Sequence, residues 1–152
     1  RPPRLQYLKS FCDYVKSHAP DVLVIGNGAV KDAESMNRMI KTAPHIDGIM
    51  IARAAVQKPW IFAELTDKAC APDSRTADLF EIAEQFTADL QQYQPPEFYE
   101  TRARRFFPFF CDNFQFGHFI KTQITATANR DAQLAILNDY FAKMPDERYV
   151  KY

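Results

Sequence analysis

The pattern of apolar and polar positions changes near residue 70. Before it, apolar residues at helical spacing in 4–18 and 27–43 alternate with continuous apolar runs at 22–26 and 45–52. Asp32 is the candidate N-cap of the second of these helices. The apolar runs have the length of strands and are typical of strands covered on both faces in a parallel sheet. The order helix, strand, helix, strand, then a turn and short helix in 53–65 predicts an α/β fold with right-handed crossovers.

The pattern after residue 76 is purely helical. Apolar residues at helical spacing predict helices over 77–93, 101–114, 117–128 and 129–144. The second helix is expected to be bent or interrupted near Pro108, and the whole part to be an all-α bundle. A polar stretch at 67–76 separates the two parts, which predicts one domain over residues 1–68 and a helical domain over residues 69–152.

Composition is that of an ordinary globular protein, with 47% hydrophobic and 25% charged residues. No apolar run approaches the roughly 20 residues that a membrane-spanning helix needs, so no membrane partner is expected. The three cysteines, Cys12, Cys70 and Cys111, are odd in number and share no metal-ligand spacing. We interpret them as reduced, structural thiols of a cytoplasmic protein, and we predict no metal site.

The net charge of zero conceals an uneven distribution. Residues 1–70 carry ten basic and seven acidic side chains, hence +3, and residues 71–152 carry nine and twelve, hence −3. Within the acidic part, "TRARR" groups Arg102, Arg104 and Arg105. These arginines could contact RNA phosphates or stack on bases, with Lys121 as a weaker candidate. The alternative is a solvated face that pairs with Glu97 or Glu100.

Glycines cluster where the two apolar runs begin or end. Gly26 ends the first run and Gly28 follows it, where Gly28 can adopt positive φ and leave backbone N–H groups accessible to an anion. The second run ends in "MIAR", with Arg53 as a charged donor. Two consecutive strand–helix units aimed at one point are typical of the phosphate site of a (β/α)8 barrel. An isolated glycine pair would instead indicate only a tight turn.

The segment "VIGNGAVKDAESMNRMI" followed by "DGIMIARAAVQKPWIFAEL" resembles the C-terminal barrel signature of tRNA-dihydrouridine synthases. The segments "ETRARRFFPFF" and "FIKTQITATANRDAQLAILNDYF" resemble the helical part of the same family. The resemblance implies the last strands and helices of a TIM barrel that carries FMN, followed by a helical domain that binds tRNA. It also implies reduction of the C5–C6 double bond of selected uridines, with NADPH as the reductant of the flavin.

Carried over by the resemblance, Asn27, Gly28 and Ala29 match the first FMN-phosphate turn of the family, and Ala52 and Arg53 match the second. Ala29 stands where the family usually has Asp, and Ala52 where it usually has Gly. A backbone N–H contact survives the second change if φ at residue 52 is negative. The carboxylate of the usual Asp has no counterpart at Ala29.

The resemblance assigns no catalytic residue to this chain. In the family a cysteine within "NxGCP" is the general acid, and Cys12, Cys70 and Cys111 lack that context. We therefore expect the N-terminal half of the barrel to precede residue 1, and the chain alone to be inactive. Two alternatives are another FMN or phosphate-binding TIM-barrel oxidoreductase that acts on a small molecule, and a non-catalytic helical RNA-binding module that dimerises to complete its sheet.

Overall fold

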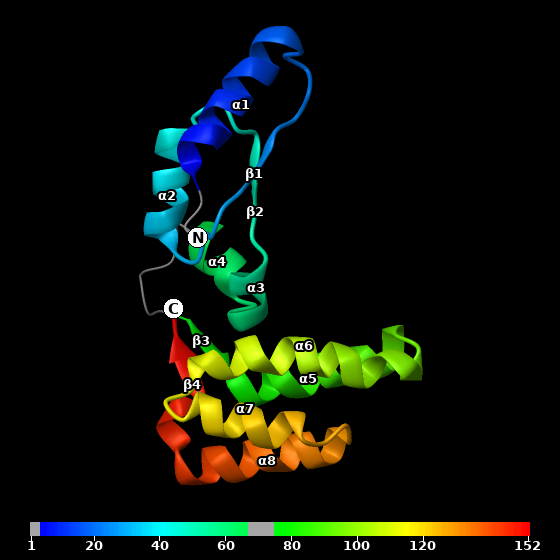
Figure 1. Cartoon of the computed structure of the whole chain (residues 1–152). Helices are drawn as coiled ribbons and strands as arrows, with labels where there is room; N and C mark the ends of the chain where they lie inside the picture. The colour runs from blue at the N-terminus through cyan, green and yellow to red at the C-terminus, as the bar shows by residue number, and fades with distance from the viewer. Residues whose placement is uncertain (1–3, 67–74) are drawn as a thin grey trace. The chain divides into compact units, whose positions relative to one another are not determined.

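The computed structural model describes residues 4–66 and 75–152. The chain divides into two compact units, Arg1–Asp67 and Lys68–Tyr152, shown in Figure 1. The expected domain boundary between residues 68 and 69 lies outside the described residues, and so does Cys70.

The first unit has the alternating order of helices and strands that the sequence predicts. It contains α1 (Leu5–His18), β1 (Ile25–Asn27), α2 (Ala33–Thr42), β2 (Gly48–Met50), α3 (Arg53–Gln57) and α4 (Ile61–Thr66). β1 and β2 are adjacent and parallel, with Gly26 opposite Ile49. The predicted parallel pairing is confirmed. The strands are shorter than the apolar runs, because the ladder forms only where both strands run side by side.

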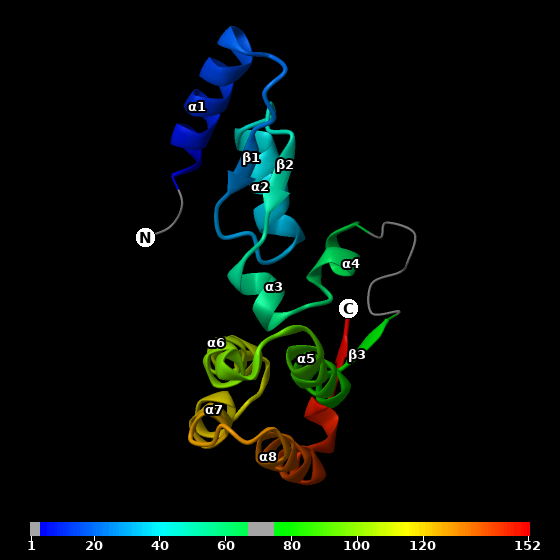
Figure 2. The same cartoon turned by 90° about the vertical axis from the view of Figure 1, so that its right-hand side faces the viewer.

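Only one face of this two-stranded sheet is covered by helices of the described residues. Figures 1 and 2 show α1 and α2 on the same side of β1 and β2. On the other side Leu23 is 72% exposed, Ile25 56% and Met50 49%. The cover that the sequence predicts for the second face is therefore not supplied by the described residues. Helices that cross over between neighbouring parallel strands with one hand all lie on one side of the sheet.

Gly26 allows α1 and α2 to approach the sheet closely. A Cβ at this position would meet Met39 Sδ at 3.1 Å, Leu8 Cδ2 at 3.2 Å and Ile46 Cδ1 at 3.3 Å. Met39 and Cys12 are completely buried on this side. The predicted span of α1 is confirmed, but Phe11, one of the apolar residues at helical spacing in 4–18, is 60% exposed.

Asp47 joins three segments of the first unit. Its carboxylate accepts hydrogen bonds from Lys16 Nζ of α1, at 2.7 Å to Oδ2, and from the backbone N–H of Val24, at 2.7 Å. The hydrogen bonds from Lys16 and Val24 hold the pKa of Asp47 below its usual range. This carboxylate therefore ties the residue just before β1 to the residue just before β2.

The second unit is mainly helical. It contains β3 (Thr76–Asp78), α5 (Leu79–Tyr93), α6 (Tyr99–Phe110), α7 (Gly117–Thr125), α8 (Arg130–Lys143) and β4 (Tyr149–Lys151), with 3₁₀ turns at Pro96–Phe98, Cys111–Asn113 and Pro145–Glu147. Consecutive helices from α5 to α8 contact one another, and α8 contacts α5 again. Figure 2 views these helices nearly end-on.

Two features of the second unit differ from the sequence-based expectation. β3 and β4 form an antiparallel pair, with Ala77 opposite Val150, so the unit is not all-α. These strands are three residues long and far apart in sequence, so no local alternation predicts them. The helix α6 also continues through Pro108 to Phe110, and the expected interruption does not occur. Pro108 lies in the last turn, where the lost N–H donor affects a single helical hydrogen bond.

A series of aromatic contacts forms the core between the helices. The ring of Phe106 stacks on Phe86 and on Phe110, with centroid distances of 3.7 Å and 4.9 Å. Phe114 continues the series to Phe141 of α8 at 5.4 Å. Four phenylalanines between residues 106 and 119 are buried in this core, Phe106, Phe107, Phe110 and Phe114. Three others, Phe109, Phe116 and Phe119, are exposed.

Candidate functional site

The loops that follow β1 and β2 leave the sheet at the same edge. Asn27, the last residue of β1, lies opposite Met50, the last residue of β2. Val30, just beyond the first loop, and Ala54, in α3 after the second, belong to one buried cluster. The structure therefore brings the predicted cofactor-binding residues after both strands to one region of the first unit. They are Asn27, Gly28, Ala29, Ala52 and Arg53.

These two loops offer unused hydrogen-bond donors. Outside the β1–β2 ladder, no acceptor is present among the described residues for the backbone N–H groups of Ala29 and Val30. Arg53, the first residue of α3, is exposed and forms no ion pair with any described residue. Unpaired N–H groups beside a guanidinium are the donor set that binds a phosphate group.

The backbone of the first loop turns at Ala29, one residue later than expected. Ala29 has φ of 53°, and among the described residues no glycine has a positive φ. The expectation that Gly28 takes this conformation is therefore not met. For an L-residue other than glycine the left-handed region costs about 1–2 kcal/mol. In the second loop Ala52 has φ of −108°, so its backbone needs no glycine.

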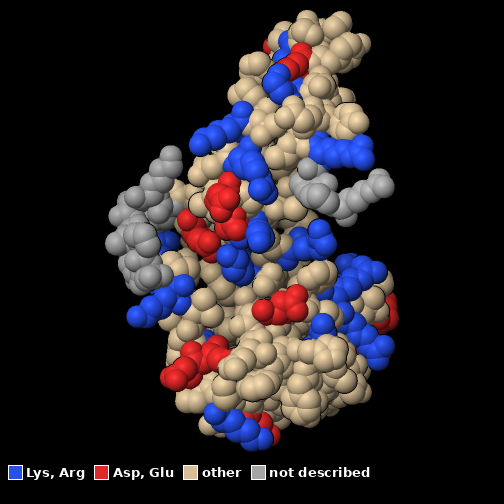
Figure 3. All heavy atoms as spheres, turned by 60° about the vertical axis from the view of Figure 1, so that its left-hand side comes forward, with Lys and Arg blue, Asp and Glu red and all other residues tan. Residues whose placement is uncertain are grey.

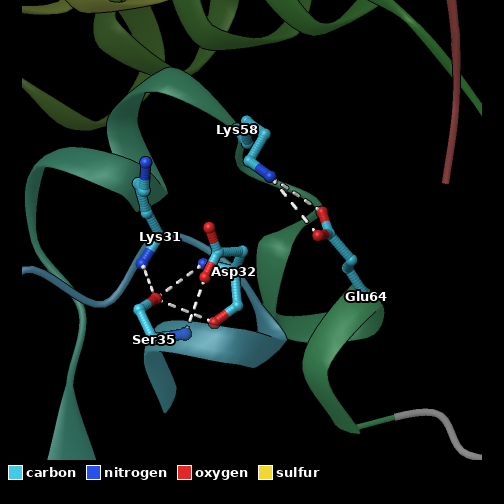
Figure 4. A network of polar contacts seen from close by, with 5 residues as sticks. All are labelled: Lys31, Asp32, Ser35, Lys58 and Glu64. Atoms are coloured by element: carbon cyan, nitrogen blue, oxygen red, sulfur yellow. Dashed lines mark hydrogen bonds and ion pairs between the residues drawn. The ribbon is translucent and has the colours of Figure 1, made fainter. Parts of the chain in front are cut away.

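The N-terminus of α2 is already capped by a carboxylate, as Figure 4 shows. The backbone N–H of Ser35 donates to Asp32 Oδ1 at 2.7 Å, and the backbone N–H of Asp32 donates to Ser35 Oγ at 3.2 Å. The predicted helix cap at Asp32 is confirmed. The hydrogen bonds from Ser35 hold the pKa of Asp32 below its usual range. Because Asp32 already occupies the helix terminus, an incoming anion would depend on the loop N–H groups.

Two lysines that the sequence reasoning did not single out lie near this cap. Lys58 Nζ donates to Glu64 Oε2 at 3.0 Å, and Lys31 forms no ion pair within the described residues. Both ammonium groups add to the lowering of the pKa of Asp32. Figure 4 shows them with the capped terminus of α2 and with Glu64 of α4. No sequence motif predicts this grouping, because Lys58 reaches it only through the turn between α3 and α4.

The described cysteines are buried. Cys12 and Cys111 are completely inaccessible. Burial raises the pKa of Cys12, and burial together with Asp112 raises the pKa of Cys111 to about 12, against the opposing charge of Lys121. Neither thiol can reach a substrate. No group of three His, Cys, Asp or Glu side chains in the described ranges is placed to hold a metal ion.

The predicted RNA-binding residues all lie in the second unit but have different surroundings. Arg102, Arg104 and Arg105 are exposed on α6, whereas Lys121 on α7 is half-buried. Arg104 Nη2 lies 2.7 Å from Glu100 Oε1, so the pairing weighed as the alternative occurs for this arginine. Arg102 and Arg105 form no ion pair with any described residue.

Basic side chains do not form one large field on the face drawn in Figure 3, where Lys and Arg are interspersed with Asp and Glu. In the described residues no helix is both long and apolar enough to cross a bilayer.

Comparison with known proteins agrees with these observations. The family model Dihydrouridine synthase (Dus) matches residues 10–144. A tRNA-dihydrouridine(47) synthase [NAD(P)(+)] of Vanderwaltozyma polyspora is 31% identical over 94 residues, which are 62% of this chain and 14% of that protein. A tRNA-dihydrouridine(47) synthase [NAD(P)(+)]-like protein of Xenopus laevis is 34% identical over 77 residues, which are 51% of this chain and 12% of that protein.

A similar match occurs in a bacterium. A protein of Aquifex aeolicus named "Probable tRNA-dihydrouridine synthase" is 43% identical over 47 residues, which are 31% of this chain and 15% of that protein. The chain thus spans about one seventh of the length of the relatives that it matches. Because the family model covers most of the residues described above, the chain belongs to the dihydrouridine synthase family.

Proposed function

We propose that this chain is the C-terminal segment of a flavin-dependent tRNA-dihydrouridine synthase, which reduces uridine in tRNA to 5,6-dihydrouridine. The relatives reported above are named for this reaction. The observation that carries the proposal is the pair of adjacent parallel strands whose following loops expose unpaired N–H groups and Arg53.

In this proposal β1 and β2 are the last strands of a (β/α)8 TIM barrel, and residues 69–152 are a helical tRNA-binding domain. Further strands of the barrel, from an N-terminal half, would cover the exposed face at Leu23, Ile25 and Met50. Cys12 and Cys111 are free thiols, which is compatible with the cytoplasmic location that we propose.

The two loops would hold the phosphate of FMN. Backbone N–H groups of Gly28 and Ala29 would donate to its oxygens, Asn27 would flank it, and Arg53 would neutralise its charge from the second loop beside Ala52. The left-handed turn at Ala29 supports this role, because such turns direct successive N–H groups toward one point. When bound, the flavin supplies hydride to the uridine ring and is itself reduced by NADPH.

The remaining groups of the reaction would come from elsewhere. Cys12 and Cys111 are too deeply buried to protonate uridine, and Cys70, which lies outside the described residues, lacks the sequence context of the family's general acid. We therefore place the catalytic cysteine outside this chain and expect these 152 residues alone to be inactive. Arg102, Arg104, Arg105 and Lys121 would contact tRNA phosphates. The two alternatives, a small-molecule oxidoreductase and a non-catalytic RNA-binding module, receive no support from the names of the relatives.

The activity is tested by measuring dihydrouridine in tRNA from cells that lack the gene. Position 47 is measured first, because the yeast and frog relatives are named for it. We expect dihydrouridine to disappear from at least one position and to return when the gene is restored. Undiminished dihydrouridine at every position, in cells without a second synthase, would contradict the proposal.

The cofactor site is tested by the flavin content of the purified full-length protein. Arg53→Ala should weaken FMN binding by about tenfold or more, because a charge-assisted contact to the phosphate is lost. Arg38→Ala is the matched control, since Arg38 is an exposed arginine on α2. Equal flavin retention in both variants would remove Arg53 from the phosphate site.

A further inference from the structure

The exposed side of α6 combines aromatic and basic side chains at helical spacing. Arg102, Arg105 and Phe109 are separated by three and four residues, which places them along one face of α6. Phe98, the last residue of the 3₁₀ turn that leads into α6, has helical backbone angles and lies four residues before Arg102, so it extends the same face. We name these residues the α6 stripe. Phe98 is 45% exposed and Phe109 37% exposed, and both arginines are exposed as well. The opposite side of α6 carries Ala103, Phe106, Phe107 and Phe110, which are buried.

The buried side of α6 is therefore already defined by other residues, and the stripe lies on the side that faces solvent. The packing of Phe106 and Phe110 against the other helices fixes the rotation of α6, and the stripe must face outward. Two of its members are aromatic side chains, whose rings are accessible to a planar partner.

The charges on the stripe are available to an anionic partner. Arg104 is neutralised by Glu100, but Arg102 and Arg105 have no carboxylate partner among the described residues. The guanidinium carbon of Arg102 lies 6.0 Å from the centre of the Phe98 ring, at the outer limit of a cation–π contact. A flat aromatic ring and a flat guanidinium thus stand together at the start of α6.

We propose that the α6 stripe binds an unpaired segment of RNA, with one base stacked on the Phe98–Arg102 pair and a neighbouring phosphate bound by Arg105. Unpaired bases stack on aromatic rings and on arginine planes, whereas bases inside a duplex have no accessible π-face. The inference rests on the proposed function only for the source of the RNA, which would be the substrate tRNA. It adds to that function a preference for a single-stranded region and a stacking residue, Phe98.

The test uses fluorescence anisotropy of the full chain with two RNA probes of equal length, an unstructured single strand and a duplex. The wild-type chain should bind the single strand at least several-fold more tightly than the duplex. Phe98→Ala should weaken single-strand binding by about tenfold and leave duplex binding unchanged. Arg105→Ala should reduce the salt dependence for the single strand by about 0.7 in log–log slope, because it removes the phosphate contact. Arg102→Ala removes part of the stacking surface instead, so it should weaken single-strand binding with a smaller change in that slope.

Two variants control for folding and for loss of apolar surface. Phe98→Leu keeps an apolar side chain but removes the ring, so it should lose nearly as much single-strand affinity as Phe98→Ala. Phe119→Ala removes an exposed phenylalanine from α7 instead, and it should bind like the wild-type chain. The helical content of each variant is compared by circular dichroism.

Failure of this inference differs from failure of the proposed function. The stripe does not bind RNA if both Phe98 variants bind the single strand like the wild-type chain, or if the wild-type chain binds neither probe. This conclusion holds even if deletion of the gene abolishes dihydrouridine. If deletion leaves dihydrouridine unchanged while the Phe98 variants lose single-strand affinity, the enzymatic proposal fails and the stripe stands.

Discussion

Arg148 holds the carboxylate of Asp78, seventy residues earlier in the chain, through two guanidinium nitrogens. Nε donates to Oδ1 and Oδ2 at 3.0 Å each, and Nη2 donates to Oδ2 at 2.7 Å. The same carboxylate caps α5, since Oδ1 accepts from the backbone N–H of Phe80 at 2.9 Å. One ion pair thus joins the start of the helical unit to its C-terminal strand.

Replacement of Arg148 should destabilise the second unit. Arg148→Ala removes the paired hydrogen bonds and the contact of the guanidinium with the Phe80 ring, whose centre lies 5.3 Å away. We expect a loss of about 2 kcal/mol in the free energy of unfolding, because the side chain of Asp78 is only 17% exposed. Urea unfolding followed by far-UV circular dichroism measures it. Lys143→Ala at the end of α8 is the control, and an equal loss there would contradict the assignment.

Acid should destabilise the second unit through the same carboxylate. Burial alone would raise the pKa of Asp78, but hydrogen bonds from Arg148 and from the backbone N–H of Glu81 hold it below its usual value. As the pH falls, the unfolded chain therefore takes up the proton first, near pH 4. Stability should be unaffected by this group above about pH 5 and fall as the pH drops through the folded pKa.

The variant Asp78→Asn isolates this contribution. Asn still caps α5 but does not titrate, so the variant should be less stable at neutral pH and lose less stability on acidification. Unfolding free energies measured in steps from pH 6 to pH 2 would show this. Parallel stability curves for the wild-type chain and the variant would refute the role of Asp78.

Ala29→Gly should stabilise the first unit. The φ of 53° at Ala29 lies in the region that disfavours any residue with a Cβ. Glycine removes this backbone strain, but its greater conformational freedom in the unfolded chain offsets part of the effect. We therefore expect the free energy of unfolding to rise by at most about 1 kcal/mol. Ala33→Gly, in the first turn of α2, should instead cost about 1 kcal/mol. Thermal unfolding compares the two, and destabilisation by both would argue against a strained turn.

Gly117→Ala should disrupt the start of α7, although alanine is the better helix former. A Cβ at residue 117 would lie 2.0 Å from the backbone oxygen of Cys111, which cannot move as a side chain can. We expect a loss of about 3 kcal/mol. At Gly48 the corresponding neighbour is Ile25 Cδ1 at 3.0 Å, the end of an exposed and flexible side chain. Gly48→Ala should therefore cost little, and similar losses at both positions would refute the explanation.

Local patterns determined the helices and their order. The spans of α1, α2, α5 and α8 follow apolar spacing, and the cap at Asp32 follows from its position before that spacing begins. The family was also evident from two short segments around residues 27 and 52, which the family match at 10–144 supports. These properties depend on residues close in sequence, whose effect on the backbone is nearly independent of the rest of the chain.

Contacts between distant residues decided the remaining features. The open face of β1 and β2, the turn at Ala29 and the pairing of β3 with β4 have no signature in the local pattern. The grouping of Lys31 and Lys58 near Asp32 likewise exists only once α3 and α4 have folded back. A strand forms only where a partner strand supplies hydrogen bonds, and the pKa of a carboxylate depends on the charged groups that lie near it in space. Both depend on which distant residues the tertiary structure brings together.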